Sequence, residues 1–131
     1  MNKEEKELLL RDLCNRLPYN VMCQVEFKED GKYNSKVMLL SGIFTDEAYF
    51  TTKGGSIYSN EYKPYLFPLS SMTEEEQRTL DSMCNGVEMV SRLSGLKMFD
   101  KAFNWLNENH FDYRGLIEKG LALDATGLKI Y

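Results

Sequence analysis

The spacing of hydrophobic residues changes once near the start of the chain, from a helical period to a period of two. Residues 3–16 carry leucines at helical spacing, and Arg11 and Arg16 follow the acidic residues, as a helix dipole favours. We therefore predict a helix over residues 3–16. It should end before Pro18, because proline disfavours helical geometry in the residue that precedes it.

From Val21 to Tyr58 the pattern predicts one antiparallel sheet. Its first two strands are separated by Asp30-Gly31, a pair that is typical of a hairpin turn. Residues 36–44 are apolar on both faces, as a central or curled strand would be, and Gly42 marks a bend. Shorter strands follow on either side of Gly54-Gly55. The first-strand side chains predicted to face the core are those of Val21, Cys23, Val25 and Phe27.

The segment Tyr62–Leu69 contains two prolines, and we predict that it is extended, because proline disrupts the interior of a helix. Since proline also lacks the amide hydrogen that a central strand donates, the segment should lie at an edge of the sheet. The expected fold class is α+β. It combines an N-terminal helix, a small antiparallel β-meander or partly open barrel of SH3 or OB type, and a helical C-terminal lobe.

A capping box over residues 73–76 predicts the start of a helix, because the Thr hydroxyl and the last Glu carboxylate can accept hydrogen bonds from each other's backbone amides. Leu80, Met83 and Cys84 are expected to form the buried face of this helix. Within residues 85–98, apolar residues favour a helix whereas two glycines favour a break. The sequence therefore leaves the structure of that range open.

Two helices joined by a short turn are predicted near the C-terminus. The first carries the only tryptophan, Trp105, which should be mostly buried between this helix and the rest of the protein. Asp112 can accept hydrogen bonds from the amides that follow it, so a second helix should span residues 113–119 and end at a left-handed Gly120. Alternating apolar residues favour a short strand within residues 125–131. The apolar stripe of the first helix consists of Met98, Ala102, Trp105 and Leu106.

Length and composition indicate one folded domain. At 131 residues the chain can bury a hydrophobic core without disulfides or metals. We expect two sublobes, residues 1–72 with the helix and β-meander and residues 73–131 as the helical lobe. The 43% of hydrophobic residues and 27% of charged ones argue against disorder. The net charge of −4 disfavours a broad basic surface for phosphate groups.

The three cysteines, Cys14, Cys23 and Cys84, are odd in number and lack the close spacing of a zinc knuckle or a redox pair. We expect them to be free, buried thiols. No apolar run approaches about 18 residues, and the N-terminus lacks the cleavage region of a signal peptide. These features predict a cytoplasmic protein without membrane partners, in which reduced cysteines are usual.

Three segments of the chain share their residues with a recognisable group of proteins. They are Leu17-Pro18-Tyr19, residues 63–66 with Pro68 and residues 70–75, and residues 105–107 with residues 110–123, whereas Phe67 and Leu69 depart from the group. Together they resemble small uncharacterised proteins encoded in phages, prophages and other mobile elements of gut bacteria. That group has no established activity, so the resemblance assigns no catalytic or binding residue. It implies an intracellular accessory protein of a mobile element.

No segment carries a catalytic, metal-binding or nucleotide-binding motif, so we expect neither enzyme activity nor a cofactor. His110 and Asp112 could pair as a base and its orienter, but one histidine without a nucleophile or further ligands favours a role at a helix end. The acidic run Glu74–Glu76 is explained by its position at a helix start. Gly54-Gly55 lies between two strands, so it is a hairpin turn rather than a phosphate-binding loop.

The turn after the tryptophan helix is the predicted partner-binding patch, because side chains between two helices can point at solvent. The competing interpretation, which the sequence slightly favours, is that these residues cap two helices and orient the second. The predicted function is a non-catalytic intracellular binding or adaptor module for a protein partner, which can be its own copy. The patch consists of His110, Asp112, Tyr113 and Arg114.

The alternative function is that of a nucleic-acid-binding accessory protein. Aromatic residues of the strands would then stack bases on one face of the barrel, as OB folds do. The acidic net charge favours the simpler interpretation that these rings pack in the core and at its edge. The residues concerned are Tyr49, Phe50, Tyr58, Tyr62 and Tyr65.

Overall fold

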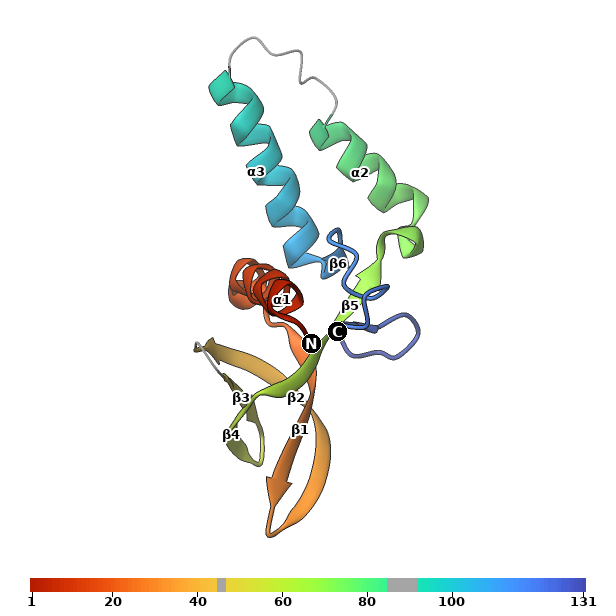
Figure 1. Ribbon diagram of the computed structural model, residues 1–131. Coiled ribbons are helices and arrows are strands. Elements are labelled where there is room, and N and C mark those ends of the chain that lie inside the picture. Colours follow the sequence, from red (N-terminus) through yellow and green to blue (C-terminus); the bar gives the residue numbers. More distant parts are fainter. Residues whose placement is uncertain (45–46, 85–91) are drawn as a thin grey trace.

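The computed structural model describes residues 1–44, 47–84 and 92–131 of the protein. It has an α+β fold with an N-terminal helix, a mixed open sheet and two later helices that project away from the sheet (Figure 1). Of the range that the sequence leaves open, residues 85–91 lie outside the described residues, and the remainder is helical.

The helices are α1 (Lys3–Arg16), α2 (Glu74–Cys84) and α3 (Arg92–Glu108), and the short 3-10 helices are η1 (Leu17–Tyr19) and η2 (Leu69–Ser71). The longer strands are β1 (Met22–Glu29), β2 (Lys32–Ile43), β3 (Ala48–Thr52), β4 (Gly55–Ser59) and β5 (Glu61–Pro68). Two short strands follow α3, namely β6 (Phe111–Asp112) and β7 (Leu123–Asp124).

Helix α1 occupies the predicted range. Glu5 N donates to Asn2 Oδ1 at 2.8 Å, and Asn2 N donates to Glu5 Oε2 at 3.3 Å, which is a capping box. The helix ends at Arg16, and η1 contains Pro18, as expected for a proline that stops an α-helix. The buried face of α1 is formed by Leu9, Asp12, Leu13 and Arg16.

Strands β1 to β4 form the predicted antiparallel sheet, in which each strand pairs with the next. Asp30 and Gly31 connect β1 to β2 with φ angles of 51° and 77°, a left-handed turn that suits these residue types. The register of β2 and β3 shifts between Leu40 and Gly42, so the predicted bend is a β-bulge. The predicted core face is confirmed, since Val21, Cys23 and Val25 are buried and Phe27 is half-buried.

Strand β5 lies inside the sheet, so the prediction of an edge strand is wrong. It pairs antiparallel with β1 over residues 61–64 and parallel with β7 and β6 over residues 65–68. Pro64 is the last residue paired with β1, and Pro68 is the last paired with β6. Each proline thus stands at the end of a ladder, where its missing amide hydrogen interrupts no further pairing.

Helices α2 and α3 pack against each other and form an arm that stands clear of the sheet (Figure 1). The predicted capping box is confirmed, because Glu76 N donates to Thr73 Oγ1 at 3.1 Å and Thr73 N donates to Glu76 Oε1 at 3.0 Å. The predicted buried face of α2 is wrong. Leu80 and Met83 are half-buried and Cys84 is exposed, because α2 packs mainly against α3 rather than against the core.

The apolar stripe predicted for α3 is confirmed at Ala102 and Leu106, which are buried. Trp105 is partly exposed, but most of its surface is covered, which agrees with the expectation that it is mostly buried. Its indole stacks on the ring of Phe111 with 5.7 Å between ring centroids, and this contact supplies part of its burial.

The predicted helix over residues 113–119 is wrong, because strand β6 and a series of turns follow α3 instead. Gly115 has a φ of 71°, a left-handed conformation that a continuous helix does not contain. Gly120 has a φ of 73°, which confirms the predicted left-handed residue. A strand within residues 125–131 is also a wrong prediction, since β7 ends before them. The chain after α3 therefore returns to the sheet.

The hydrophobic core lies between α1, the inner face of the sheet and the chain after α3. Among the described residues, no member of this core comes from α2 or α3. The two helices of the arm thus depend on each other and on contacts at the base of α3. The core consists of Leu9, Leu13, Val21, Cys23, Val25, Met38, Leu40, Ala48, Phe50, Leu66, Leu116, Leu121 and Ala122.

Candidate functional site

Helix α3 carries a buried row and an exposed row of hydrophobic residues next to each other. Ala102 and Leu106 are buried, whereas Leu96, Phe99 and Phe103 have exposed fractions of 66%, 48% and 46%. The exposed three recur at intervals of three and four residues, so they form one stripe along the helix, called the outer stripe below. Within residues 1–44, 47–84 and 92–131, the outer stripe is an exposed apolar surface on a folded arm.

Tyr113 extends the outer stripe beyond the end of α3. Its ring centroid lies 5.3 Å from that of Phe103, in a tilted arrangement that aromatic pairs prefer. Tyr113 Oη donates to Asn107 Oδ1 at 2.9 Å, and Asn107 is itself buried. The hydrogen bond fixes the ring of Tyr113 next to the stripe.

Two guanidinium groups contact the ring of Tyr113. The Cζ atoms of Arg16 and Arg114 lie 5.2 Å and 5.0 Å from the ring centroid. Arg16 Nε donates to Asp12 Oδ2 at 2.7 Å, and Arg16 Nη2 donates to the carbonyl of Phe111 at 2.6 Å. Arg114 Nη1 lies 3.6 Å from Asp12 Oδ1. One carboxylate therefore faces two guanidinium groups.

The charge cluster of Asp12, Arg16 and Arg114 holds two positive groups and one negative group, a net charge of +1. The side chains of Asp12 and Arg16 are fully buried, and that of Arg114 is 20% exposed. Asp12 Oδ1 and the Nη1 atoms of both arginines have no hydrogen-bond partner among the described residues. A buried charge is stabilised by pairing with an opposite charge. Since the cluster has two guanidinium groups and one carboxylate, part of its positive charge is uncompensated.

The structure separates the four residues of the predicted patch. Tyr113 and Arg114 are partly exposed, whereas His110 and Asp112 are buried, so the expectation that all four point at solvent is wrong. The two carboxylate oxygens of Asp112 accept from the backbone amides four and five residues onward, both at 2.9 Å. Asp112 therefore caps, as the competing interpretation held, although it caps a turn rather than a helix. With its oxygens so occupied, a base-and-orienter pair with His110 has no support.

His110 lies in the turn two residues after the end of α3, has a φ of 63° and stacks on Tyr131. The two ring centroids are 3.6 Å apart, and the ring planes differ by 13°. Burial and the nearby Arg16 guanidinium lower the pKa of His110 from 6.5 to about 4. The ring also borders a hollow of about 410 Å³ whose lining includes Glu76 and Glu108. His110 is thus neutral near pH 7 and packs as an aromatic ring.

The aromatic residues considered for base stacking differ in accessibility. Phe50 and Tyr65 are buried, Tyr49 and Tyr62 are half-buried, and Tyr58 is 56% exposed. The tilted pair of Tyr49 and Tyr58, with 4.9 Å between centroids, is what the surface of the sheet offers to a base.

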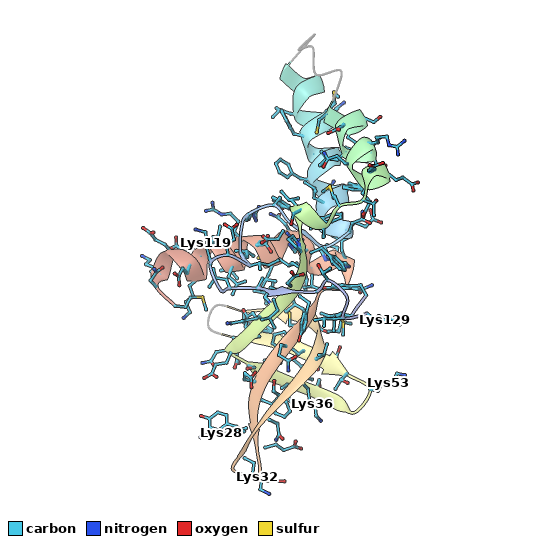
Figure 2. The ribbon with its side chains drawn as sticks, turned by 90° about the vertical axis from the view of Figure 1, so that its right-hand side faces the viewer. Lys28, Lys32, Lys36, Lys53, Lys119 and Lys129 are labelled. Atoms are coloured by element: carbon cyan, nitrogen blue, oxygen red, sulfur yellow. The ribbon has the colours of Figure 1, made fainter. Side chains whose placement is uncertain are left out.

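Lysines stand beside aromatic rings on the β1–β2 hairpin. Lys28 Nζ lies 4.9 Å from the ring centroid of Tyr33, and Lys36 Nζ lies 5.8 Å from that of Phe27. Lys32 is at the same end of the hairpin (Figure 2). Acidic residues in the same turn offset part of this positive charge.

The cysteines are free, as predicted, but only Cys23 is buried, whereas Cys14 and Cys84 are exposed. Burial raises the pKa of the Cys23 thiol and keeps it in the unreactive protonated form. Within residues 1–44, 47–84 and 92–131, no three His, Cys, Asp or Glu side chains are grouped so that they could hold a metal ion. None of the helices in that same part of the chain has the length and apolar character needed to cross a bilayer.

Sequence reasoning missed Asp12 and Arg16, although a signal was present. They lie three and seven positions after Leu9 and, with Leu13, share the core face of α1. Opposite charges four residues apart at core-face positions are the pattern that identifies a buried pair.

Comparison with models of protein families, with curated proteins and with solved structures finds no match to this chain. The outer stripe and the charge cluster are therefore the observations from which a function is inferred.

Proposed function

We propose that the protein is a non-catalytic binding module that engages a partner protein through the outer stripe of α3. The observation that carries this proposal is the exposure of Leu96, Phe99 and Phe103 in a single line, on an arm outside the hydrophobic core. A contiguous exposed apolar surface marks an interaction site, because its burial against a partner removes it from water.

The spacing of the outer stripe supports a helix-mediated contact. Leu96, Phe99 and Phe103 occupy positions i, i+3 and i+7, which is the spacing of anchor residues in helix-mediated recognition. Two of the three anchors are aromatic, and large aromatic side chains contribute strongly to protein interfaces. The neighbouring row of α3, which contains the buried Ala102 and Leu106, holds the helix to the rest of the protein.

A partly open barrel of SH3 or OB type is the scaffold that we propose for the arm. β4 pairs with β3 and β5 pairs with β1, yet only Asn60 separates β4 from β5. Ser59 Oγ, at the end of β4, donates to the carbonyl of Glu26 in β1 at 2.6 Å. The continuous segment from β4 to β5 thus lies along both edges of the sheet formed by β1, β2 and β3, at β3 and at β1. This arrangement supports a curled sheet.

The cellular setting is part of the same proposal. The resemblance to accessory proteins of mobile elements implies an intracellular protein, and a cytoplasmic location suits the free thiols of Cys14 and Cys84. The partner is then a protein of the same compartment.

The test uses photocrosslinking in the native host cells. A photoreactive residue replaces Phe99 in one version of the protein and Lys101 in another, because Lys101 is exposed on α3 but borders the hollow that α2 lines. We expect one partner to be crosslinked from position 99 and not from position 101. The identified partner, once purified, should bind the Phe99→Ser variant at least about 30-fold more weakly, as expected for a central anchor. Equal crosslinking from both positions would contradict the proposal.

A second candidate function is nucleic-acid binding, and the lysines beside aromatic rings on the β1–β2 hairpin favour it. The test is a salt titration with single-stranded and duplex DNA, because phosphate contacts give an affinity that falls steeply with salt. Replacing Lys28 and Lys36 with glutamine should then reduce the salt dependence. If no binding is detected at low salt, this candidate is removed.

A further inference from the structure

Arg114 is the more weakly paired of the two arginines in the charge cluster. Asp12 is already bonded to Arg16 at 2.7 Å, whereas Arg114 Nη1 remains at 3.6 Å from the same carboxylate. The distance to Arg114 exceeds that of a direct hydrogen bond. The single negative charge is thus committed to Arg16, and the excess positive charge resides on Arg114.

Arg114 is also the accessible member of the cluster. Its side chain is 20% exposed, whereas those of Asp12 and Arg16 are fully buried. Because Nη1 of Arg114 is itself buried, an external carboxylate would accept from another nitrogen of the guanidinium group, and this bond would compensate the excess charge without moving the buried pair.

The outer stripe and Arg114 form one continuous surface. Phe103 contacts the ring of Tyr113, and the guanidinium group of Arg114 lies over the same ring. Leu96 and Phe103 are seven residues apart, which is about 10 Å along the helix axis. A ligand that covers the stripe and reaches Arg114 therefore needs at least about two to three helical turns.

We propose that this surface binds an amphipathic segment of the partner protein, with apolar residues on the stripe and an Asp or Glu side chain on Arg114. The inference rests on the proposed function and specifies the chemistry of its partner. Charge complementarity sets the position of the acidic residue, which lies at the Tyr113 end of the apolar face.

A second copy of the chain fits this surface less well. A twofold interface over the stripe would place Arg114 of each copy toward the Leu96 end of the other copy, because only residues on the axis meet themselves. The stripe residues at that end are apolar, so Arg114 would gain no carboxylate from the second copy. The partner that the charges favour is therefore a different chain that supplies a carboxylate.

The test begins with selection from a displayed library of random helical peptides against the full-length protein. We expect the enriched peptides to share apolar residues three or four apart and one Asp or Glu beyond them. A synthetic peptide of this kind is then compared with its Asn or Gln counterpart by fluorescence anisotropy, on the unmodified protein and on the R114Q, K101Q and F99S variants.

The acidic peptide should bind R114Q about tenfold more weakly than the unmodified protein, the loss expected for one charge-assisted hydrogen bond. The amide peptide should bind both proteins equally, which also shows that R114Q is folded. K101Q is the matched control and should bind the acidic peptide as the unmodified protein does.

Three results would overturn the proposal. If the peptides need Phe99 but not Arg114 or the acid, the partner chemistry is wrong while the proposed function survives. If F99S binds every peptide normally, both the partner chemistry and the proposed function fail. If sedimentation shows self-association that F99S abolishes, a second copy occupies the stripe instead.

Discussion

Helices α1 and α3 are both amphipathic in sequence, but neither buries only apolar residues and exposes only polar ones. α1 buries the charged side chains of Asp12 and Arg16 within the protein. α3 exposes Leu96, Phe99 and Phe103 on the arm. Burial thus depends on what each helix face contacts, and not only on the polarity of the residues that form it.

These two exceptions to the amphipathic pattern have different physical supports. The charges of α1 are tolerated because Asp12 and Arg16 pair with each other and Arg16 also bonds to the carbonyl of Phe111. The outer stripe of α3 has no such compensation within the described residues. Buried charges that are paired, as in α1, are expected to maintain the fold. Exposed apolar residues that nothing in the described chain covers, as on α3, are expected at a binding surface.

The largest expected effect comes from breaking the buried pair of α1. Asp12→Ala leaves the fully buried Arg16 without its counter-charge and should lower the free energy of unfolding by about 3 to 5 kcal/mol. Urea denaturation measures this loss. Glu7→Ala, an exposed change on the same helix, should alter stability by less than about 0.5 kcal/mol. Similar small values for both variants would show that the pair is not a structural requirement.

On α3, truncation on the side that faces the protein should have an intermediate effect. Trp105→Ala removes an indole that is half-buried and stacked on Phe111. The free energy of unfolding should fall by about 2 to 3 kcal/mol, less than the 3 to 5 kcal/mol typical of fully buried aromatic residues. A loss near zero would mean that the stack does not hold α3 in place.

The pH dependence of stability tests how burial and the nearby Arg16 guanidinium act on His110. Because the pKa of His110 is lowered from 6.5 to about 4, the unfolded chain binds a proton between these pH values that the folded chain does not. Stability should therefore fall by about 1 to 2 kcal/mol as the pH drops from 6.5 to 4, with allowance for partial screening by solvent. Glu76 and Glu108, across the hollow, limit the effect because they favour the protonated ring.

The control for this dependence is His110→Asn, since asparagine tolerates the left-handed backbone at this position. The variant loses the stack on Tyr131, so its stability is lower at every pH, but the slope between pH 6.5 and 4 should become shallower. An unchanged slope would assign the dependence to other groups.

The smallest effect on folding is expected at the outer stripe. Phe99→Ser removes a ring that is 48% exposed and should change the free energy of unfolding by about 0.5 kcal/mol, whereas Phe103→Ser also removes the pair with Tyr113 and should cost about 1 kcal/mol. Thermal unfolding followed by circular dichroism measures the change. A loss of several degrees in both variants would show that the stripe packs within the chain and would remove the contrast with α1.

Local signals in the sequence were sufficient for much of the fold. The Thr73 capping box, the Asp30-Gly31 turn and the alternation around Val25 each depend on residues close together in the chain. These elements lie where the sequence predicts them, because the forces that define them act over a few residues.

Long-range pairing was not predictable in the same way. Strands β6 and β7 span two residues each, which is too short for any periodic pattern, and their parallel pairing with β5 depends on the tertiary structure. Gly115 was read as part of a helix because a sequence does not reveal its positive φ.

The candidate site was predicted in part. Tyr113 and Arg114 were identified, but the helix that lies beneath them is α1, and sequence spacing does not show which distant helix packs against a turn. The outer stripe was overlooked because α3 has a second apolar face, formed by residues such as Leu106, that accounts for its amphipathic pattern.

The hydrogen bond from Arg16 to Phe111 joins positions 95 residues apart, and the hydroxyl of Tyr131 accepts from the amide of Met22 across 109 residues. A ribosome releases the chain from its N-terminus, so α1 and the start of β1 emerge long before these partners exist. Nascent chains that stop before residue 111 should therefore leave the Arg16 guanidinium and the core face of α1 accessible to chaperones, and protection of α1 from proteolysis should begin only when the C-terminal segment has been synthesised.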